Sequence, residues 1–303
     1  MRTIPFFVLD AFTDTPFAGN PAGVFFDDAA SLSDDEMRRL AGEVSLESAF
    51  VLPAPNGVDL RLRYFTGTTE VPLCGHATVA AMTALAHAGR VVVGVEILRV
   101  ATPVGVLNVA LNEAGSGVDV TLFQNPPVFG PVLNKEAVGE VARALGCAPG
   151  DIEATGLPVQ RVSTGTPWLF APVTSRLAVD GAPSDLAAIL RLSREQETFG
   201  VYVFAVERDA QSGGPAIWSR CFAPIAGLDE DPVTGSASGA LGAYLWAHGQ
   251  LAAIGGENGL VRFVARQGFA GGRGGVVRIA VGPATIAVTG AAVLVAEGAF
   301  RLP

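Results

Sequence analysis

Two stretches of this chain repeat one another at a constant offset, which constrains the fold more than any other feature. The stretch EVPLCGHATVAAMTALAHAG (70–89) aligns without a gap on EDPVTGSASGALGAYLWAHG (230–249), 160 positions later. Both contain an acidic-x-Pro-x-x-Gly entrance into a helix, in which Gly75 is equivalent to Gly235. A duplicated domain places equivalent elements about a pseudo-twofold axis, so we expect two similar halves whose helix entrances face one cleft.

The remaining pattern predicts an α+β fold, in which each half has a curved, mostly antiparallel sheet around a central helix. Just upstream of the repeat, RYFTG (63–67) is echoed by RCFAP (220–224). The prolines of NPPVFGP (125–131) mark a boundary, which predicts domains 1–127 and 128–303, with the last strand able to pack back on the first half. The expected strands are 4–10, 22–26, 48–52, 60–65, 94–100, 105–111, 117–123, 159–163, 168–173, 200–206 and 216–222. The expected helices are 33–42, with a capping box from Ser33 to Glu36, 76–88, 135–145 and 236–248.

Composition excludes several classes of protein. With 303 residues, 50% hydrophobic and 16% charged, the chain is long and apolar enough for a sizeable buried core. A net charge of −9 without any Lys/Arg cluster gives no electrostatic reason to bind nucleic acid or anionic lipid. Pro and Asp residues near the N-terminus interrupt the apolar core that a signal peptide would need, so we expect cytoplasmic residence. Gly and Pro interrupt every apolar stretch, so we expect no membrane span. The C-terminal 281–300 is expected to form paired strands.

The thiols and imidazoles do not predict a metal centre. The three cysteines are Cys74, Cys147 and Cys221, an odd and widely spaced set typical of reduced thiols. Without a CxxC or HxxxH pattern a zinc site would need unusual spacing, so no metal is expected. His87 and His248 lie near the ends of the repeated helices, where a cation complements the helix dipole, and are assigned no function. Trp168, Trp218 and Trp246 are interpreted as core residues.

Each helix entrance is a candidate anion-binding element. A glycine followed by a helix start exposes backbone N–H groups at the positive end of the dipole. Two such ends would hold a carboxylate and stabilise the enolate-like charge formed when a neighbouring proton is removed. The alternative is that Gly75 and Gly235 only form tight strand-to-helix turns.

Four strings resemble signature regions of the PhzF (phenazine biosynthesis-like) family. They are GNPAGV (19–24), AGEVSLESAFV (41–51), FTGTTEVPLCGHATVAA (65–81) and FAPIAGLDEDPVTGSASGAL (222–241), and they occur in the family's order. The resemblance implies a diaminopimelate-epimerase-like fold and acid–base isomerisation or epimerisation of a small carboxylate without a cofactor. It also implies a homodimer.

The resemblance assigns roles to individual residues. Glu47 matches the family's catalytic glutamate, and His76 would donate to a substrate oxygen or relay the proton. Asp231 matches an orienting or proton-sharing carboxylate and Ser236 a hydroxyl donor, beside the amides of Gly75 and Gly235. Without the resemblance, the preferred interpretation of Glu47 is an exposed charge at a strand edge. His76 is alternatively a hydrogen-bonded residue at the helix start, and Asp231 and Ser236 are alternatively ordinary helix-entry residues.

Cys74 precedes Gly75, whereas the equivalent position in the second half is Thr234. Threonine is no comparable base at neutral pH, so a two-thiol racemase is disfavoured. The Cys/Thr pairing is similar to that of hydroxyproline dehydratases of the proline-racemase family, which leaves a dehydratase as an alternative. Cys74 is otherwise a small packing residue. A non-catalytic small-molecule binding protein is the opposing class, and turnover would discriminate between them.

Overall fold

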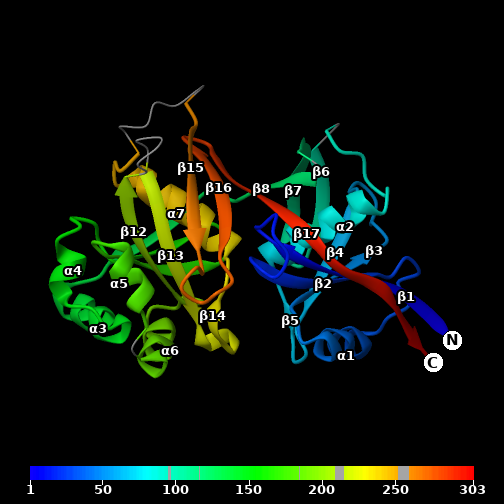
Figure 1. The fold of residues 1–303 in the computed structure, drawn as a ribbon, viewed down its shortest axis with the longest axis horizontal. Coiled ribbons are helices and arrows are strands. Elements are labelled where there is room, and N and C mark those ends of the chain that lie inside the picture. The colour runs from blue at the N-terminus through cyan, green and yellow to red at the C-terminus, as the bar shows by residue number, and fades with distance from the viewer. Residues whose placement is uncertain (95–96, 116, 184, 209–214, 252–258) are drawn as a thin grey trace. The chain divides into compact units, whose positions relative to one another are not determined.

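The chain forms two compact units in a computed structural model that describes residues 1–94, 97–115, 117–183, 185–208, 215–251 and 259–303. Unit 1 comprises Met1–Phe123 and Thr289–Pro303, and unit 2 comprises Gln124–Val288. The division therefore differs from the expected boundary at 127/128. The C-terminal residues belong to unit 1 because β17 (Thr285–Leu302) pairs antiparallel with β1 (Arg2–Ala11), which places the two termini side by side (Figure 1).

The strands of unit 1 follow one another around a sheet that closes on itself. They are β1, β2 (Asn20–Phe26), β3 (Ser48–Leu52), β4 (Leu60–Phe65), β5 (Glu70–Val71), β6 (Ile97–Thr102), β7 (Gly105–Ala114) and β8 (Gly117–Phe123). Neighbours pair in the order β1-β2-β3-β4-β6-β7-β8, and β17 joins β8 to β1. The pairs β2·β3 and β4·β6 are parallel and the others along the chain are antiparallel. This closure explains why β17 must return to the first half.

Helix α2 (Gly75–His87) is buried inside unit 1. Its composition is apolar on nearly every side, which is typical of a helix enclosed by other elements. It contacts β1, β2, β3 and β8. The other helix of this unit, α1 (Asp34–Val44), begins with the predicted capping box from Ser33 to Glu36. It ends two residues later than predicted, where Ser45 adopts a left-handed conformation with φ 54°.

Unit 2 repeats the pairing pattern of unit 1. Its strands are β9 (Val128–Val132), β10 (Gln160–Ser163), β11 (Pro167–Pro172), β12 (Val201–Arg208), β13 (Pro215–Ala223), β14 (Leu228–Asp231), β15 (Val261–Gln267) and β16 (Gly275–Gly282). The pairs β11·β12 and β13·β15 are parallel, while β12·β13 and β15·β16 are antiparallel. Helix α7 (Gly235–Ala247) starts and ends 160 residues after α2 and contacts β10, β11 and β16.

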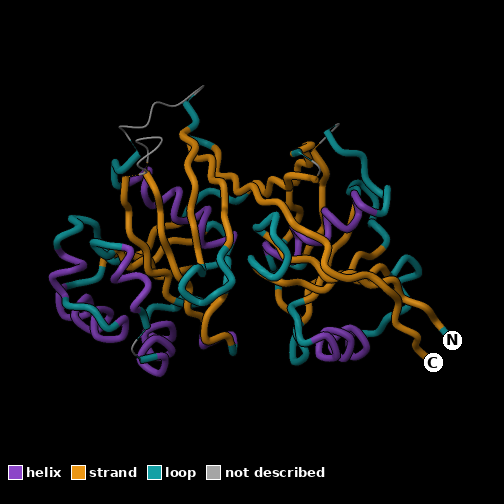
Figure 2. Tube along the Cα trace, in the orientation of Figure 1, coloured by secondary structure: helices purple, strands orange, loops and turns teal. Residues whose placement is uncertain are grey.

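Four further helices cover a second core in unit 2. They are α3 (Lys135–Leu145), α4 (Pro149–Glu153), α5 (Arg176–Gly181) and α6 (Leu186–Glu195). They gather on one side of the unit (Figure 2), where Leu145, Ile189 and Leu192 pack against Val201 and Val203 of β12. Only α3 was predicted from the sequence. Within the described ranges, the structure has no helix that is both long and apolar enough to span a membrane.

Several strand predictions differ in extent from the structure; the strand expected at 105–111, for example, is observed as Gly105–Ala114. The strand expected at 94–100 is observed as β6 from Ile97, and residues 95–96 lie outside the described part of the chain. The segment 281–300, expected to form paired strands, contains the end of β16 and most of the 18-residue β17. Pro283 and Ala284 separate the two strands.

Candidate functional site

Glu47 lies directly before β3, and its backbone is fixed by a neighbouring strand. The N–H of Gly23 in β2 donates to the Glu47 carbonyl at 3.2 Å. A Cβ at position 23 would lie only 2.5 Å from Ser48 Oγ, so a larger residue there would have to displace the side chain of Ser48, the neighbour of Glu47. The GNPAGV string thereby contributes to positioning Glu47. The side chain of Glu47 is 22% exposed, which makes it half-buried rather than an exposed strand-edge charge.

The start of α2 brings two further groups to the Glu47 carboxylate. Cys74 is the N-cap residue of the helix and His76 lies in its first turn; both are buried. The Cys74 thiol donates to Glu47 Oε2 at 3.3 Å, and His76 Nε2 lies 3.4 Å from the same oxygen. Cys74 Sγ is 3.4 Å from His76 Nδ1 and 3.7 Å from Nε2. A carboxylate, a thiol and an imidazole therefore meet at one helix start.

Cys74 is more than the small packing residue that the sequence suggests. It is 5% exposed, as a packing residue would be, yet its thiol contacts the candidate base. Its carbonyl accepts from Thr78 Oγ1 at 2.7 Å, and the Tyr64 hydroxyl lies 2.7 Å from the same Thr78 oxygen. Because Thr78 donates to Cys74, Tyr64 is the donor to Thr78. Burial raises the pKa of Tyr64, which keeps this hydroxyl protonated as a donor.

In unit 2 the equivalent turn holds Asp231 and Thr234 together. Asp231 is the last residue of β14, and Thr234 is the N-cap residue of α7. The Thr234 hydroxyl donates to Asp231 Oδ2 at 2.6 Å. Gln267 fixes both residues: its Nε2 donates to the Asp231 carbonyl at 2.8 Å and to Thr234 Oγ1 at 2.9 Å, and its Oε1 accepts from the Thr234 N–H at 3.0 Å. Gln267 is fully buried, so this frame is rigid.

The first turn of α7 is held by residues that the sequence did not identify. Trp168 Nε1 donates to Ser236 Oγ at 3.2 Å. Gln124 Nε2 donates to the Gly235 carbonyl at 3.0 Å, and Gln124 Oε1 accepts from Thr164 Oγ1 at 2.6 Å. Trp168 is buried, as expected of a core residue, and also orients a candidate site hydroxyl. Trp168 lies on β11, while Gln124 and Thr164 directly follow β8 and β10, so all three are distant from α7 in sequence and no local pattern marks them.

An arginine–glutamate bridge supports each turn. Arg63 Nε and Nη2 each donate to Glu70 at 2.7 Å. Arg220 Nε and Nη2 donate to Glu230 at 2.8 and 2.7 Å. Both pairs are bidentate, the geometry that best fixes a carboxylate. The arginines belong to RYFTG and RCFAP, and the glutamates are the first residues of the two long repeats. The shared bridge explains why these positions are the same in both halves.

The two repeated helices begin differently from the other long helices. The caps of α1, α3, α5 and α6 accept a hydrogen bond from the helix, through the side chains of Ser33, Asn134, Ser175 and Asp185. In the described structure, neither Cys74 nor Thr234 makes such a side-chain cap. The Thr234 hydroxyl is directed to Asp231 instead. The first N–H groups of α2 and α7 can therefore bind an anion.

Of the other groups suggested by the sequence, Cys221 adjoins the turn of unit 2, whereas His248 and His87 lie apart from both turns. Cys221 is fully buried on β13, where burial first and the Asp231 carboxylate second raise the pKa of its thiol. His248 Nε2 lies 2.9 Å from Gln160 Oε1, and burial lowers the pKa of this imidazole. His87 pairs with Glu297 at 3.3 Å on β17. Both imidazoles have structural partners, consistent with their lack of an assigned function.

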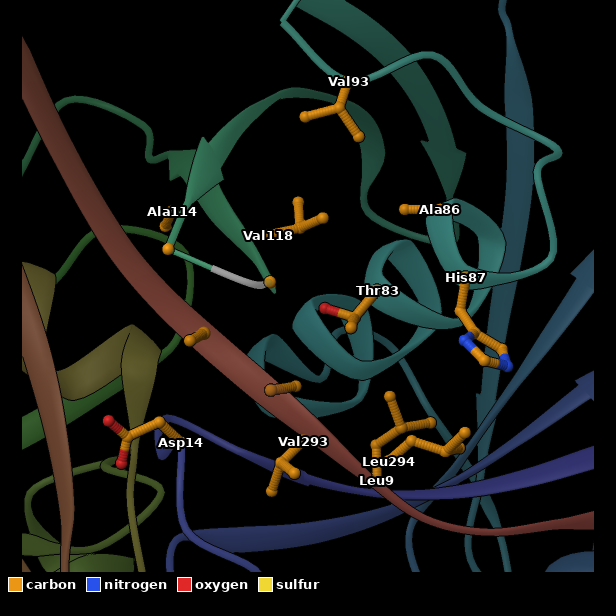
Figure 3. Close-up of a pocket in the computed structure, with 14 residues that line it drawn as sticks. Leu9, Asp14, Thr83, Ala86, His87, Val93, Ala114, Val118, Val293 and Leu294 are labelled. Carbon is orange, nitrogen blue, oxygen red and sulfur yellow. The ribbon is translucent and has the colours of Figure 1, made fainter.

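A cavity of about 570 Å³ lies at the opposite end of α2 from Glu47. Figure 3 shows His87, Thr83 and Val118 around it, with β17 passing along one side. The residues of the described chain that line this cavity do not include Glu47, Cys74 or His76. Because α2 has 13 residues, its two ends are separated by about 18 Å. This cavity is therefore distinct from the candidate site.

Comparison with known proteins gives consistent matches. The sequence model of the phenazine biosynthesis-like protein family (PhzC-PhzF) matches residues 9–298. A protein of Escherichia coli O157:H7 named uncharacterized isomerase YddE is 36% identical, with 97% of this chain and 98% of that protein covered. The trans-2,3-dihydro-3-hydroxyanthranilate isomerase of Pseudomonas fluorescens is 32% identical, with 80% of each covered. The crystal structure of a Bacillus anthracis PhzF-family phenazine biosynthesis protein aligns with TM-score 0.84 and 30% identity over 100% of both chains.

Proposed function

Because this chain belongs to the phenazine biosynthesis-like (PhzF) family of isomerases, we propose that it moves a proton on a small carboxylate substrate without a cofactor. The observation that carries the proposal is the half-buried Glu47 carboxylate at the start of α2, in contact with Cys74 and His76. A carboxylate in this position can abstract a proton from a carbon activated by a neighbouring carboxylate. Glu47 is therefore assigned as the general base.

The proton and charge follow a simple course in this proposal. Glu47 takes the proton from the activated carbon, and the electron pair moves into the substrate carboxylate as an enolate-like anion. Backbone N–H groups at the start of α2 stabilise that charge, and His76 donates to a substrate oxygen or relays the proton. Return of the proton to the same carbon gives epimerisation, and its return to another carbon gives isomerisation.

The unit 2 residues complete the assignment. Asp231 orients the substrate or shares the proton, Ser236 donates a hydrogen bond, and the Gly75 and Gly235 amides bind the carboxylate. In this proposal the residues of unit 1 and those of unit 2 act on one substrate in an interdomain cleft, and the enzyme is a cytoplasmic homodimer. It therefore predicts that Asp231→Asn and Glu47→Gln impair the same exchange reaction.

The test is solvent-deuterium incorporation at the activated carbon, measured over a panel of small carboxylates. The panel includes trans-2,3-dihydro-3-hydroxyanthranilate, the substrate named for the Pseudomonas fluorescens relative. Glu47→Gln keeps the volume of the side chain and removes its basicity, so exchange should fall by about 10²-fold or more while folding survives. The matched control is Glu43→Gln, which removes an exposed carboxylate four residues earlier and should leave exchange unchanged.

Cys74→Ala separates this mechanism from a thiol-based dehydratase or racemase. A two-base racemase would need a second thiol at position 234, which is a threonine whose hydroxyl donates to Asp231. Cys74→Ala should consequently reduce exchange far less than Glu47→Gln. Loss of exchange in Cys74→Ala with retention in Glu47→Gln would overturn the assignment. Tight carboxylate binding without exchange over the whole panel would favour a binding protein.

A further inference from the structure

Glu47, Cys74 and His76 place three different metal-ligating atoms at the corners of one triangle. Glu47 Oε2, Cys74 Sγ and His76 Nε2 are separated by 3.3 Å for O···S, 3.4 Å for O···N and 3.7 Å for S···N. Each residue offers one ligand atom to this group. No sequence pattern predicts this group, because the glutamate lies 27 residues before the cysteine and Cys-x-His is not a common zinc spacing.

The triangle has the dimensions of one face of a zinc tetrahedron. Zinc binds sulfur at about 2.3 Å, imidazole nitrogen at about 2.0–2.1 Å and carboxylate oxygen at about 2.0–2.2 Å. Tetrahedral angles then give edges of about 3.6 Å for S···N and S···O and about 3.4 Å for N···O. The three observed separations agree with these edges to within about 0.3 Å. Little movement of the side chains is therefore needed to place a metal ion between them.

The ligand set and its surroundings also suit zinc. Thiolate and imidazole ligands favour zinc over magnesium or calcium, which prefer oxygen. Cys74 and His76 are 5% and 6% exposed, so their positions are fixed by the packing of α2. Glu47 is fixed through its backbone by Gly23. A rigid triangle of three protein ligands leaves a fourth tetrahedral position open.

We propose that this triangle is a Zn²⁺ site with Glu47, Cys74 and His76 as ligands and water or a substrate carboxylate in the fourth position. Binding requires the Cys74 thiol to lose its proton to solvent and His76 Nε2 to offer its lone pair to the ion. Zinc occupies the Glu47 oxygen that would otherwise accept the substrate proton. The ion is therefore an inhibitor, and only this inhibitory consequence rests on the proposed function.

The second half of the repeat provides an internal contrast. The positions equivalent to Cys74 and His76 are Thr234 and Ser236, so the same turn lacks both soft ligands. The Thr234 hydroxyl is directed to Asp231. We accordingly assign one zinc ion to unit 1 and none to the equivalent turn of unit 2.

Binding can be tested with metal alone, on the full chain without a histidine tag. Cobalt(II) is the probe, since thiolate ligation produces a charge-transfer band in the near ultraviolet and tetrahedral geometry produces intense visible bands. We expect one equivalent of cobalt to give both features and Zn²⁺ to abolish them by displacement. Calorimetry with Zn²⁺ should give the same stoichiometry.

Variants identify the ligands. Cys74→Ser should remove the charge-transfer band, and Glu47→Gln and His76→Gln should each weaken zinc binding by at least about tenfold, since even second-shell changes cost that much. Cys147→Ala and Cys221→Ala remove the other thiols and should leave the spectrum unchanged. A band that persists in Cys74→Ser, a band lost in Cys147→Ala or Cys221→Ala, or no binding at millimolar metal would each overturn the site.

The inhibitory consequence is measured separately by deuterium exchange at increasing Zn²⁺. Exchange should be lost at the zinc concentration that saturates the cobalt-competition curve and be restored by a chelator. Exchange that continues on the fully loaded protein would refute the blocking of Glu47. The two proposals fail independently, because metal binding is scored without substrate and the Glu47→Gln exchange assay is scored without metal.

Discussion

Gly239 in α7 is the position where a single methyl group should most clearly disturb the candidate site. A Cβ built there would lie 2.1 Å from Gln124 Oε1, 2.4 Å from Cδ and 2.6 Å from Nε2. The whole Gln124 amide must therefore move in Gly239→Ala. That amide holds the Gly235 carbonyl at 3.0 Å and accepts from Thr164 at 2.6 Å. Both hydrogen bonds should be lost.

The expected cost follows from these contacts. Two hydrogen bonds contribute about 0.5–1.5 kcal/mol each, and the buried Thr164 hydroxyl adds a penalty if it finds no new partner. Replacing a helical glycine by alanine returns up to about 1 kcal/mol. We therefore expect Gly239→Ala to reduce the free energy of unfolding by about 1–3 kcal/mol. Gly139→Ala in α3 is the matched control, since its Cβ would meet no atom within 4 Å. That variant should stabilise the protein by about 0.5–1 kcal/mol.

Tryptophan fluorescence during urea unfolding measures the effect on unit 2 alone, because Trp168, Trp218 and Trp246 all lie between Gln124 and Val288. The decisive comparison repeats Gly239→Ala in a Gln124→Ala background. Without the glutamine amide the collision is removed, so the same substitution should become neutral or stabilising. The double-mutant cycle thus predicts a change of sign.

Two results would refute this reasoning. If Gly239→Ala stabilises unit 2 as much as Gly139→Ala does, the Gln124 amide does not occupy the space beside α7. If Gly239→Ala destabilises equally with and without Gln124, the cost comes from another neighbour. Either outcome would also remove the assigned role of Gln124 in holding the Gly235 carbonyl.

Two further predictions concern ion pairs of the scaffold. Arg220→Met should lower the free energy of unfolding of unit 2 by about 2–4 kcal/mol, because the Arg220 and Glu230 side chains are only 12% and 21% exposed and Glu230 would lose its partner. Tryptophan fluorescence during urea unfolding measures this loss. The control is Arg191→Met at an exposed position, which should change the same free energy by less than about 0.5 kcal/mol. The hydrogen bond from Arg2 lowers the pKa of Glu36 from 4.5 to about 2, so its contribution is present above pH 4.5 and is lost as pH falls toward 2. Hydrogen exchange of α1 should show this loss in the wild type and not in Glu36→Gln, and an identical pH profile in both would contradict it.

The sequence predicted the parts of the fold that repeat. Because the two long stretches align without a gap, the helix at 76–88 could be transferred to 236–248, and both are observed within one residue. Helices α5 and α6 were missed because they interrupt unit 2 at a point where the described residues of unit 1 form only α1. The sequence analysis allowed the last strand to pack back on the first half, and β17 pairs with β1 in this way. The register of that pairing links residues from opposite ends of the chain, and no local pattern encodes it.

Residues of the candidate site that are close in sequence could be grouped from the sequence itself, whereas Glu47 was assigned through the family resemblance. Cys74, Gly75 and His76 share one turn, and Asp231 lies three residues before Thr234. Gln267 and Trp168 reach that second turn from β15 and β11, more than 30 residues away, and glutamine and tryptophan are ordinary residues in strands. The contact of Cys74 with Glu47 depends on packing between α2 and β3. The sequence therefore suggested a packing residue or the thiol of a dehydratase-like Cys/Thr pair for Cys74, and did not predict its contact with Glu47.

The two halves share a scaffold and differ in the chemistry placed on it. An Arg–Glu bridge supports each turn, and Thr78 and Ser238 donate to the N-cap carbonyls of Cys74 and Thr234 at 2.7 and 2.9 Å. On this common frame, unit 1 carries a thiol and an imidazole where unit 2 carries two hydroxyls. Hydroxyl groups of serine and threonine do not titrate near neutral pH. Imidazoles do, and the pKa of a thiol lies close enough that its surroundings can shift it there. Duplication therefore accounts for the backbone geometry of both turns, and at the two differing positions only the turn of unit 1 carries a thiol and an imidazole.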